Sequence, residues 1–347
     1  MTIPEQRTGR LRQYFQFLVA VLYFFLAQSL ARHGAVGLAN DAWSPLLMQA
    51  MLLFLLTLGY AAMGFWLEGQ LQPIKEQGWP VRPGWTGEAG RGLAVGWGAA
   101  VICVLPLALA GGIAIVLTTE IAAWGWLAAD AAYFALLAAA EEVAFRGFGF
   151  QRLRQATGPV TASLAFAVFY ALLQGMLPGS SRASTAVSIV FSLLLSAAYL
   201  RTRALWVSWG LNFGWKASRA LLFGLTVSGV SSHSPVVEGN PMGPWWLTGG
   251  GFGLDGSWWA FVVLLAAFPA LFRVTRELDY RYNAPVIEPG GVPVDLSRAA
   301  EAQHTAGTGD ANAPLIQIGM APPATPRNGG QEAPQDPAPG IPNEMGS

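Results

Sequence analysis

Long apolar stretches alternate with short polar connectors along most of the chain. Eight of these stretches approach the roughly 20 apolar residues that a helix needs to cross a bilayer. They lie at about residues 14–30, 44–67, 92–117, 121–145, 160–177, 184–200, 205–225 and 258–272. The pattern predicts an all-α, polytopic transmembrane helix bundle of about eight spans. The first stretch is too long for a signal-peptide core and no cleavage site closes it, so we predict a retained span.

Composition also favours a membrane protein. Of the 347 residues, 53% are hydrophobic and only 12% are charged, against roughly 25% charged in an average soluble protein. The formal net charge is +0 and no basic patch is interleaved with aromatic residues, so nucleic acid is not an expected partner. The single cysteine, Cys103, excludes an intrachain disulfide framework.

Lys and Arg residues predict the orientation of the spans. With the N-terminus placed in the cytoplasm, the outer connectors contain only Arg32 and Arg182, whereas the inner segments are rich in Arg. Positive residues favour the cytoplasmic side of short loops. We therefore predict a multi-pass protein of the cell membrane, with both termini cytoplasmic and an even number of spans.

The pattern divides the chain into three regions. Residues 1–120 are predicted to hold N-terminal spans and a cytoplasmic loop, and residues 121–275 to form the core. Residues 276–347 are predicted to be a disordered cytoplasmic tail, since that region is rich in Pro, Gly and Ala. Gly92 and Gly96, four residues apart, predict the close approach of a second helix. The Gly- and Trp-rich stretch 226–257 is typical of an interfacial cap.

Charged residues interrupt one apolar stretch, in the run AAAEEVAFRGFGF at residues 138–150. An ionised side chain in the bilayer costs roughly 2.5–3.5 kcal/mol on insertion scales, so Glu141, Glu142 and Arg146 mark either a site or a structural lock. Glu142 and Arg146 are one helical turn apart and are predicted to pair, while Glu141 points about 100° away from Glu142. Glu141 is therefore the predicted free carboxylate, available as a general base or acid.

Three more polar residues lie in apolar surroundings: Gln174, Asn212 and Lys216. A Gln or Asn in a span commonly hydrogen-bonds to another helix. Lys216 needs a counter-charge, and the acids predicted at its depth are Glu141 and Asp130. A salt bridge between Lys216 and Glu141 is the preferred arrangement.

The segments EEVAFRGFGFQRL, YALLQGMLP and YLRTRALWVSWGLNFGWKASRALLFGLTVSG resemble the three successive motifs of the CPBP family. This family comprises CAAX-type intramembrane proteases and bacteriocin-processing relatives, and the likeness covers about residues 130–257. The first motif, Glu-Glu-x-x-x-Arg, matches fully at Glu141, Glu142 and Arg146. The resemblance implies a CPBP-type helical core and endoproteolysis of a membrane-adjacent peptide, such as a prenylated tail.

The second and third motifs depart from the family pattern. The family places a His four residues after an aromatic residue, where this chain has Gln174 after Tyr170. It places His and Asn four apart, where this chain has Asn212 and Lys216. The family is described as containing metal-dependent or glutamate proteases, in which Glu activates water while His and Asn orient it and hold the oxyanion. The resemblance thus implies catalytic positions at Glu141, Glu142, Arg146, Gln174, Asn212 and Lys216, the last three altered.

No metal or other cofactor is predicted. The three histidines, His33, His233 and His304, are all expected outside the spans, which leaves no histidine-based zinc site in the membrane core. The remaining oxygen donors would suit Mg²⁺ or Mn²⁺ better than zinc.

The sequence leaves three functions open, of which only the first is enzymatic. A protease with an altered site would use Glu141 as base and Lys216 to stabilise the oxyanion, although Lys216 within about 4 Å would weaken that base. A catalytically silent relative, a pseudoenzyme, would bind a peptide, a lipidated peptide or a partner in the same cavity, a role that the resemblance to family members linked to bacteriocin self-immunity implies. In the third, Glu141 and Lys216 relay protons or ions.

Overall fold

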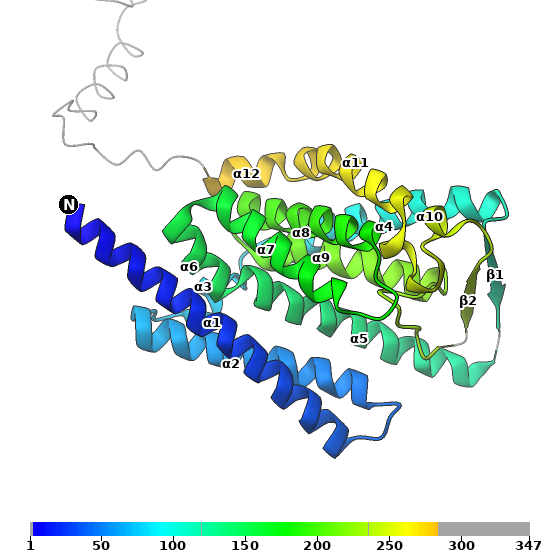
Figure 1. The fold of residues 1–347 in the computed structure, drawn as a ribbon, viewed down its shortest axis with the longest axis horizontal. Coiled ribbons are helices and arrows are strands. Elements are labelled where there is room, and N and C mark those ends of the chain that lie inside the picture. Colours follow the sequence, from blue (N-terminus) through cyan, green and yellow to red (C-terminus); the bar gives the residue numbers. More distant parts are fainter. Residues whose placement is uncertain (1–2, 119, 235, 284–347) are drawn as a thin grey trace, which may run out of the picture. The chain divides into compact units, whose positions relative to one another are not determined.

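Each of the eight apolar stretches contributes a helix in the computed structural model, which describes residues 3–118, 120–234 and 236–283. The predicted all-α, polytopic bundle is therefore confirmed (Figure 1). Its longer helices are α1 (Ile3–Leu38), α2 (Ser44–Glu68), α4 (Trp85–Leu109), α5 (Ile121–Arg146), α7 (Pro159–Gly175), α8 (Arg182–Thr202), α9 (Leu205–Ala217) and α11 (Trp258–Val274). Shorter helices are α3 (Pro73–Glu76), α6 (Phe148–Thr157), α10 (Trp245–Thr248) and α12 (Arg276–Asn283).

Within these described residues, five helices are long and apolar enough to cross a membrane, and a sixth joins them if the bent pair α11 and α12 is one span. The five are α1 from Gly9, α2, α4, the segment Ala123–Thr157 that covers α5 and α6, and α8. The stretches predicted at 160–177 and 205–225 also form helices, but α7 has 17 residues and α9 only 13 before a π-helix at Ser218–Leu222. Both are shorter than the roughly 20 residues of a full span.

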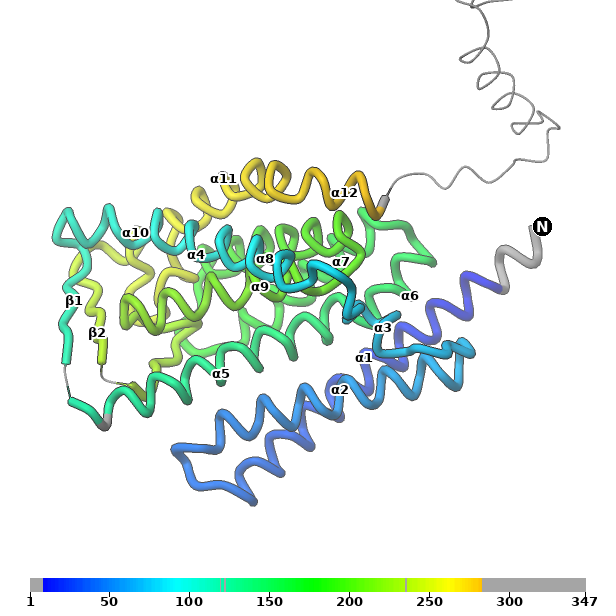
Figure 2. Tube along the Cα trace, turned by 180° about the vertical axis from the view of Figure 1, so that it is seen from behind, coloured from blue at the N-terminus to red at the C-terminus, as the bar shows by residue number. Residues whose placement is uncertain are grey.

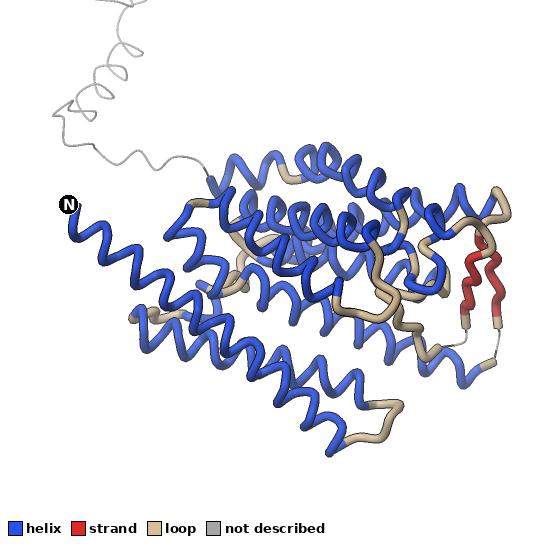
Figure 3. Tube along the Cα trace, viewed as in Figure 1, coloured by secondary structure: helices blue, strands red, loops and turns tan. Residues whose placement is uncertain are grey.

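The prediction of a third span at 92–117 is wrong at the C-terminal end of that range. Helix α4 ends at Leu109, and residues Ile113–Leu117 form strand β1. Gly111 takes φ 74°, a left-handed conformation that ends the helix, and the β-branched sequence IAIVL then favours a strand. Strand β1 pairs antiparallel with β2 (Val237–Pro241), from the segment predicted to form a cap. The strands lie together at one end of the bundle, as Figure 3 shows in red.

Both ends of the described chain lie at the opposite end of the bundle (Figure 1). Helix α12 differs from the predicted disorder at 276–347, because its residues have partners in the bundle. Asp279 pairs with Arg201 at 2.9 Å, and the Tyr282 hydroxyl donates to Glu88 at 3.1 Å while its ring lies 3.6 Å from the Arg82 guanidinium. The rest of the predicted tail, from residue 284, lies outside the described residues.

Helix α9 is positioned by an unusually close contact with α4, and the two run side by side in Figure 2. A Cβ atom on Gly92 would lie 2.0 Å from the carbonyl oxygen of Val207, and one on Gly96 would lie 2.3 Å from that of Leu211. Gly210 and Gly214 face α4 in the same way, at 2.1 Å and 2.6 Å from its carbonyl oxygens. The predicted role of Gly92 and Gly96 is confirmed: only glycine allows the two backbones this close.

We expect Gly96→Ala to lower the free energy of unfolding by about 1–3 kcal/mol, because the added methyl group meets rigid backbone rather than a movable side chain. Gly98→Ala is the matched control, since nothing lies within 4 Å of a Cβ at Gly98 on the same helix. Denaturation midpoints of the two purified variants measure the difference. Equal midpoints would contradict the close contact.

Candidate functional site

The carboxylates lie in the last turns of α5, where the helix stops directly after Arg146. Gly147 breaks the helix with ψ −140°, and a Cβ there would lie 2.3 Å from the Val143 carbonyl oxygen. The chain then turns into α6. This break fixes Glu141, Glu142 and Arg146 at the end of a long helix, against which α9 packs.

Glu142 and Arg146 form the predicted ion pair. Arg146 Nη1 lies 3.3 Å from Glu142 Oε1, and both side chains are completely buried. The Arg146 Nη2 group also donates to the backbone oxygen of Ser192 at 3.0 Å and to its hydroxyl at 3.1 Å. The pair therefore ties α5 to α8.

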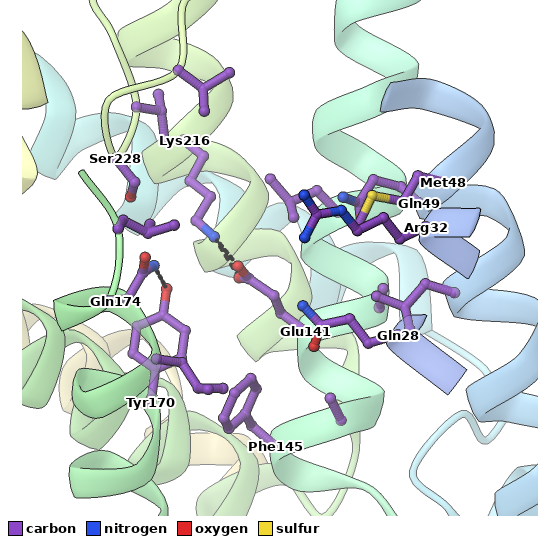
Figure 4. A pocket seen from close by; sticks show the side chains of 18 of the residues that line it. Gln28, Arg32, Met48, Gln49, Glu141, Phe145, Tyr170, Gln174, Lys216 and Ser228 are labelled. Atoms are coloured by element: carbon purple, nitrogen blue, oxygen red, sulfur yellow. Dashed lines mark hydrogen bonds and ion pairs between the residues drawn. The ribbon is translucent and has the colours of Figure 1, made fainter. Parts of the chain in front are cut away.

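Glu141 and Lys216 form an ion pair between α5 and α9, as predicted (Figure 4). The Lys216 ammonium hydrogen-bonds to both carboxylate oxygens of Glu141. The lysine side chain is 4% exposed and the glutamate side chain 16% exposed. Asp130, the other candidate counter-ion, is engaged elsewhere: its oxygens lie 2.8 Å from His233 Nδ1 and 2.8 Å from the Ser234 amide.

Asn212 connects the two glutamates. Its Nδ2 group donates to Glu141 Oε2 at 2.9 Å and to Glu142 Oε1 at 3.1 Å, and its side chain is fully buried. An amide has two N–H donors, so this geometry uses both. Five of the six predicted site residues thus belong to one hydrogen-bonded network: Glu141, Glu142, Arg146, Asn212 and Lys216.

Gln174 is near this network but bonds to a different residue. Its Nε2 group donates to the Tyr170 hydroxyl at 2.9 Å, one turn earlier on α7. Among the described residues, no hydrogen bond joins Gln174 to either glutamate. Figure 4 shows Gln174 and Tyr170 across the cavity from Glu141.

A cavity of about 550 Å³ adjoins the ion pair. Helices α1, α2, α5, α7 and α9 and the loop at 227–230 contribute to its wall, which includes Glu141, Lys216, Tyr170 and Gln174. Most of the remaining wall is apolar, and the volume is within the range of small-molecule sites. One edge of the acidic network therefore faces a space that can hold a ligand.

Sequence reasoning missed a second buried ion pair next to the first. Arg219 Nη1, in the π-helix one turn beyond Trp215, lies 2.8 Å from Asp255 Oδ1. Asp255 also accepts from the Trp215 indole at 3.3 Å and from the amide and hydroxyl of Ser228 at 3.1 Å. Burial alone would raise the pKa of Asp255, but the charges of Arg219 and Lys216 and the hydrogen bonds from Arg219 and Ser228 hold it below its ordinary value. The sequence signal that could have revealed this pair is Arg219 itself, a charged residue within the seventh apolar stretch.

The donor set does not fit a divalent cation. The Lys216 ammonium already neutralises Glu141 and would repel a metal ion there. In the described part of the chain, no group of three or more His, Cys, Asp or Glu residues is placed to hold a metal. His233 lies in a loop as expected, whereas His33 lies in α1 within the candidate span Gly9–Leu38, which corrects its prediction. His304 lies outside the described residues.

Comparison with known families identifies the core. The family model for type II CAAX prenyl endopeptidase Rce1-like proteins matches residues 123–218, a segment that includes all six predicted site residues. The comparisons with curated proteins and with solved structures gave no match. The apolar helices and this match agree with the motifs quoted above. Residues 123–218 therefore form an Rce1-like segment of the CPBP type, in a chain whose apolar helices are those of an integral membrane protein.

Proposed function

We propose that this protein is a catalytically silent member of its family that binds a membrane-adjacent peptide in the 550 Å³ cavity. The observation that supports this proposal is the set of hydrogen bonds that Glu141 accepts. Its two carboxylate oxygens accept hydrogen bonds from Lys216, and one of them also accepts from Asn212. A general base must instead accept a proton from a water molecule.

The energetics point the same way. A water molecule that is to give its proton to this carboxylate must compete with the Lys216 ammonium for the same two oxygens. Releasing Glu141 would leave Lys216 as an unpaired charge that is 4% exposed, and breaking a buried pair costs about 3–5 kcal/mol. Asn212 is also committed to the two glutamates rather than to a developing oxyanion. Both roles that the family implies, a Glu that activates water and an amide that holds the oxyanion, are thus weakened.

Proteolysis is the second candidate, favoured by the partial exposure of Glu141 to the cavity. A substrate carbonyl in the cavity would come close to this carboxylate. In that case the Lys216 ammonium would stabilise the oxyanion. The relay of protons or ions by the same pair stays a prediction.

The proposed orientation places the end of the bundle that holds α12 and the start of α1 in the cytoplasm of the cell. That end holds the ion pairs of Arg12 and Arg152 with Glu68 and of Arg201 with Asp279. The abundance of Arg there agrees with the positive-inside bias. The peptide would then meet the cavity within the membrane.

Full-length protein in nanodiscs, mixed with a panel of lipidated and unlipidated fluorescent peptides, tests the proposal. We expect binding without cleavage, and a binding loss in Glu141→Ala because Lys216 is left uncompensated in the cavity wall. Glu238→Ala, at an exposed residue of β2 away from this cavity, is the matched control. Cleavage that Glu141→Ala abolishes would contradict the proposal of a catalytically silent protein and favour proteolysis. A protein that shows no binding and no cleavage would contradict both proposed functions.

A further inference from the structure

The cavity carries one cation that its own walls do not neutralise. Its charged lining residues are Arg32, Glu141 and Lys216, and the last two pair with each other. Arg32 forms no ion pair among the described residues. The lining therefore has a net charge of one positive unit, located on α1. Figure 4 shows the Arg32 side chain extending toward the Glu141–Lys216 pair.

Arg32 is exposed, and its position along α1 lies within a candidate membrane span. It lies six residues before Leu38, the end of α1, which is about 9 Å at 1.5 Å per residue. This position is inside the candidate span Gly9–Leu38. Charged residues within spans are rare and usually face a cavity or pair with an opposite charge. A bound anion would give Arg32 such a partner.

Two amide side chains add hydrogen-bonding groups to this part of the wall. Gln28 lies one turn before Arg32 on α1, and Gln49 comes from α2. Gln49 is only 7% exposed, and its Oε1 atom has no hydrogen-bond partner within the described part of the chain. Rotation of a glutamine amide exchanges its donor and acceptor, so this group is able to donate to an anion.

The remaining wall suits an alkyl chain. Apolar residues from four helices line it, including Phe24, Leu52, Leu137, Ala144, Phe145 and Leu173. Burial of each methylene group in such surroundings contributes about 0.8 kcal/mol. The volume of about 550 Å³ is suited to one ligand molecule.

We infer that this cavity binds a long-chain fatty acid, with its carboxylate on Arg32 and its chain along the apolar wall. A guanidinium holds a carboxylate by two parallel hydrogen bonds, with the Gln28 and Gln49 amides as further donors. A single carboxylate also matches the single excess charge. The inference goes beyond the peptide binding proposed above and does not depend on it, because it concerns a different ligand of the same cavity and rests on Arg32 rather than on Glu141.

Radiolabelled palmitate, titrated onto full-length protein in phosphatidylcholine nanodiscs, tests this inference. We expect saturable binding that Arg32→Gln weakens at least tenfold, a change of about 1.4 kcal/mol. Arg182→Gln, at an exposed arginine on α8 that does not line the cavity, should leave binding unchanged. Hexadecanol, which keeps the chain without the charge, should bind wild type at least tenfold more weakly than palmitate.

Several results would overturn the fatty-acid site. One is equal binding of palmitate by wild type and Arg32→Gln, and another is equal binding of palmitate and hexadecanol. A third is selective binding of phosphatidylglycerol, or of a peptide with a free C-terminus, through Arg32 without palmitate binding. Palmitate binding by a protein that binds no peptide would support this site while contradicting the proposed function, so the two failures are distinguishable.

Discussion

Replacing Arg146 by Leu is expected to lower the free energy of unfolding by about 3–5 kcal/mol, because it leaves the Glu142 charge buried beside an apolar side chain. Both side chains are fully buried, so water cannot replace the missing guanidinium. The substitution also removes two hydrogen bonds to Ser192 on α8. Denaturation of the purified variant in mild detergent measures the loss.

Two further variants make this result specific. Arg273→Leu removes an exposed arginine near the end of α11 and should change stability by less than about 0.5 kcal/mol. The double change Glu142→Met with Arg146→Leu removes both charges and should recover much of the stability that the single change loses. A double variant as unstable as Arg146→Leu would contradict a cost arising from the unpaired charge.

Restoring the family residues should raise proteolysis by at least about 10²-fold, since a single oxyanion donor is typically worth about 10² to 10³ in rate. The variant combines Gln174→His, Asn212→His and Lys216→Asn. It removes the cation from Glu141 and supplies the imidazoles that the family places there. Cleavage of the peptide panel, followed by mass spectrometry, measures the gain.

Two controls accompany the triple variant. Adding Glu141→Ala should abolish any new activity, because the carboxylate is then missing. Lys216→Asn alone separates removal of the cation from the addition of histidines. A triple variant that folds and binds peptide but does not cleave it would count against the correspondence between these three positions and the family motifs.

The sequence predicts those parts of the site that depend on local geometry or on charge balance. The Glu142–Arg146 pair follows from a spacing of four residues on one helix. The Glu141–Lys216 pair follows because a buried ammonium requires a counter-charge. Gly92 and Gly96 similarly reveal a close helix contact through their spacing.

The parts that escaped prediction depend on distances between remote segments. Asn212 bridges both glutamates because α4 holds α9 close to α5, which spacing along the chain does not reveal. Asp255 lies in a loop 36 residues after Arg219 and is brought to it only by tertiary folding. The pattern predicts Arg32 in a connector, whereas α1 extends several residues beyond the predicted end and contains it.

The glycine contact between α4 and α9 extends the functional unit beyond the matched segment. Helix α4 precedes the matched segment 123–218, yet it sets the position of the helix that carries Asn212 and Lys216. A fragment beginning at residue 120 would lose this support and leave Gly210 and Gly214 without the backbone they adjoin. The geometry of the motif-bearing segment therefore depends on a helix that lies outside it and does not line the cavity.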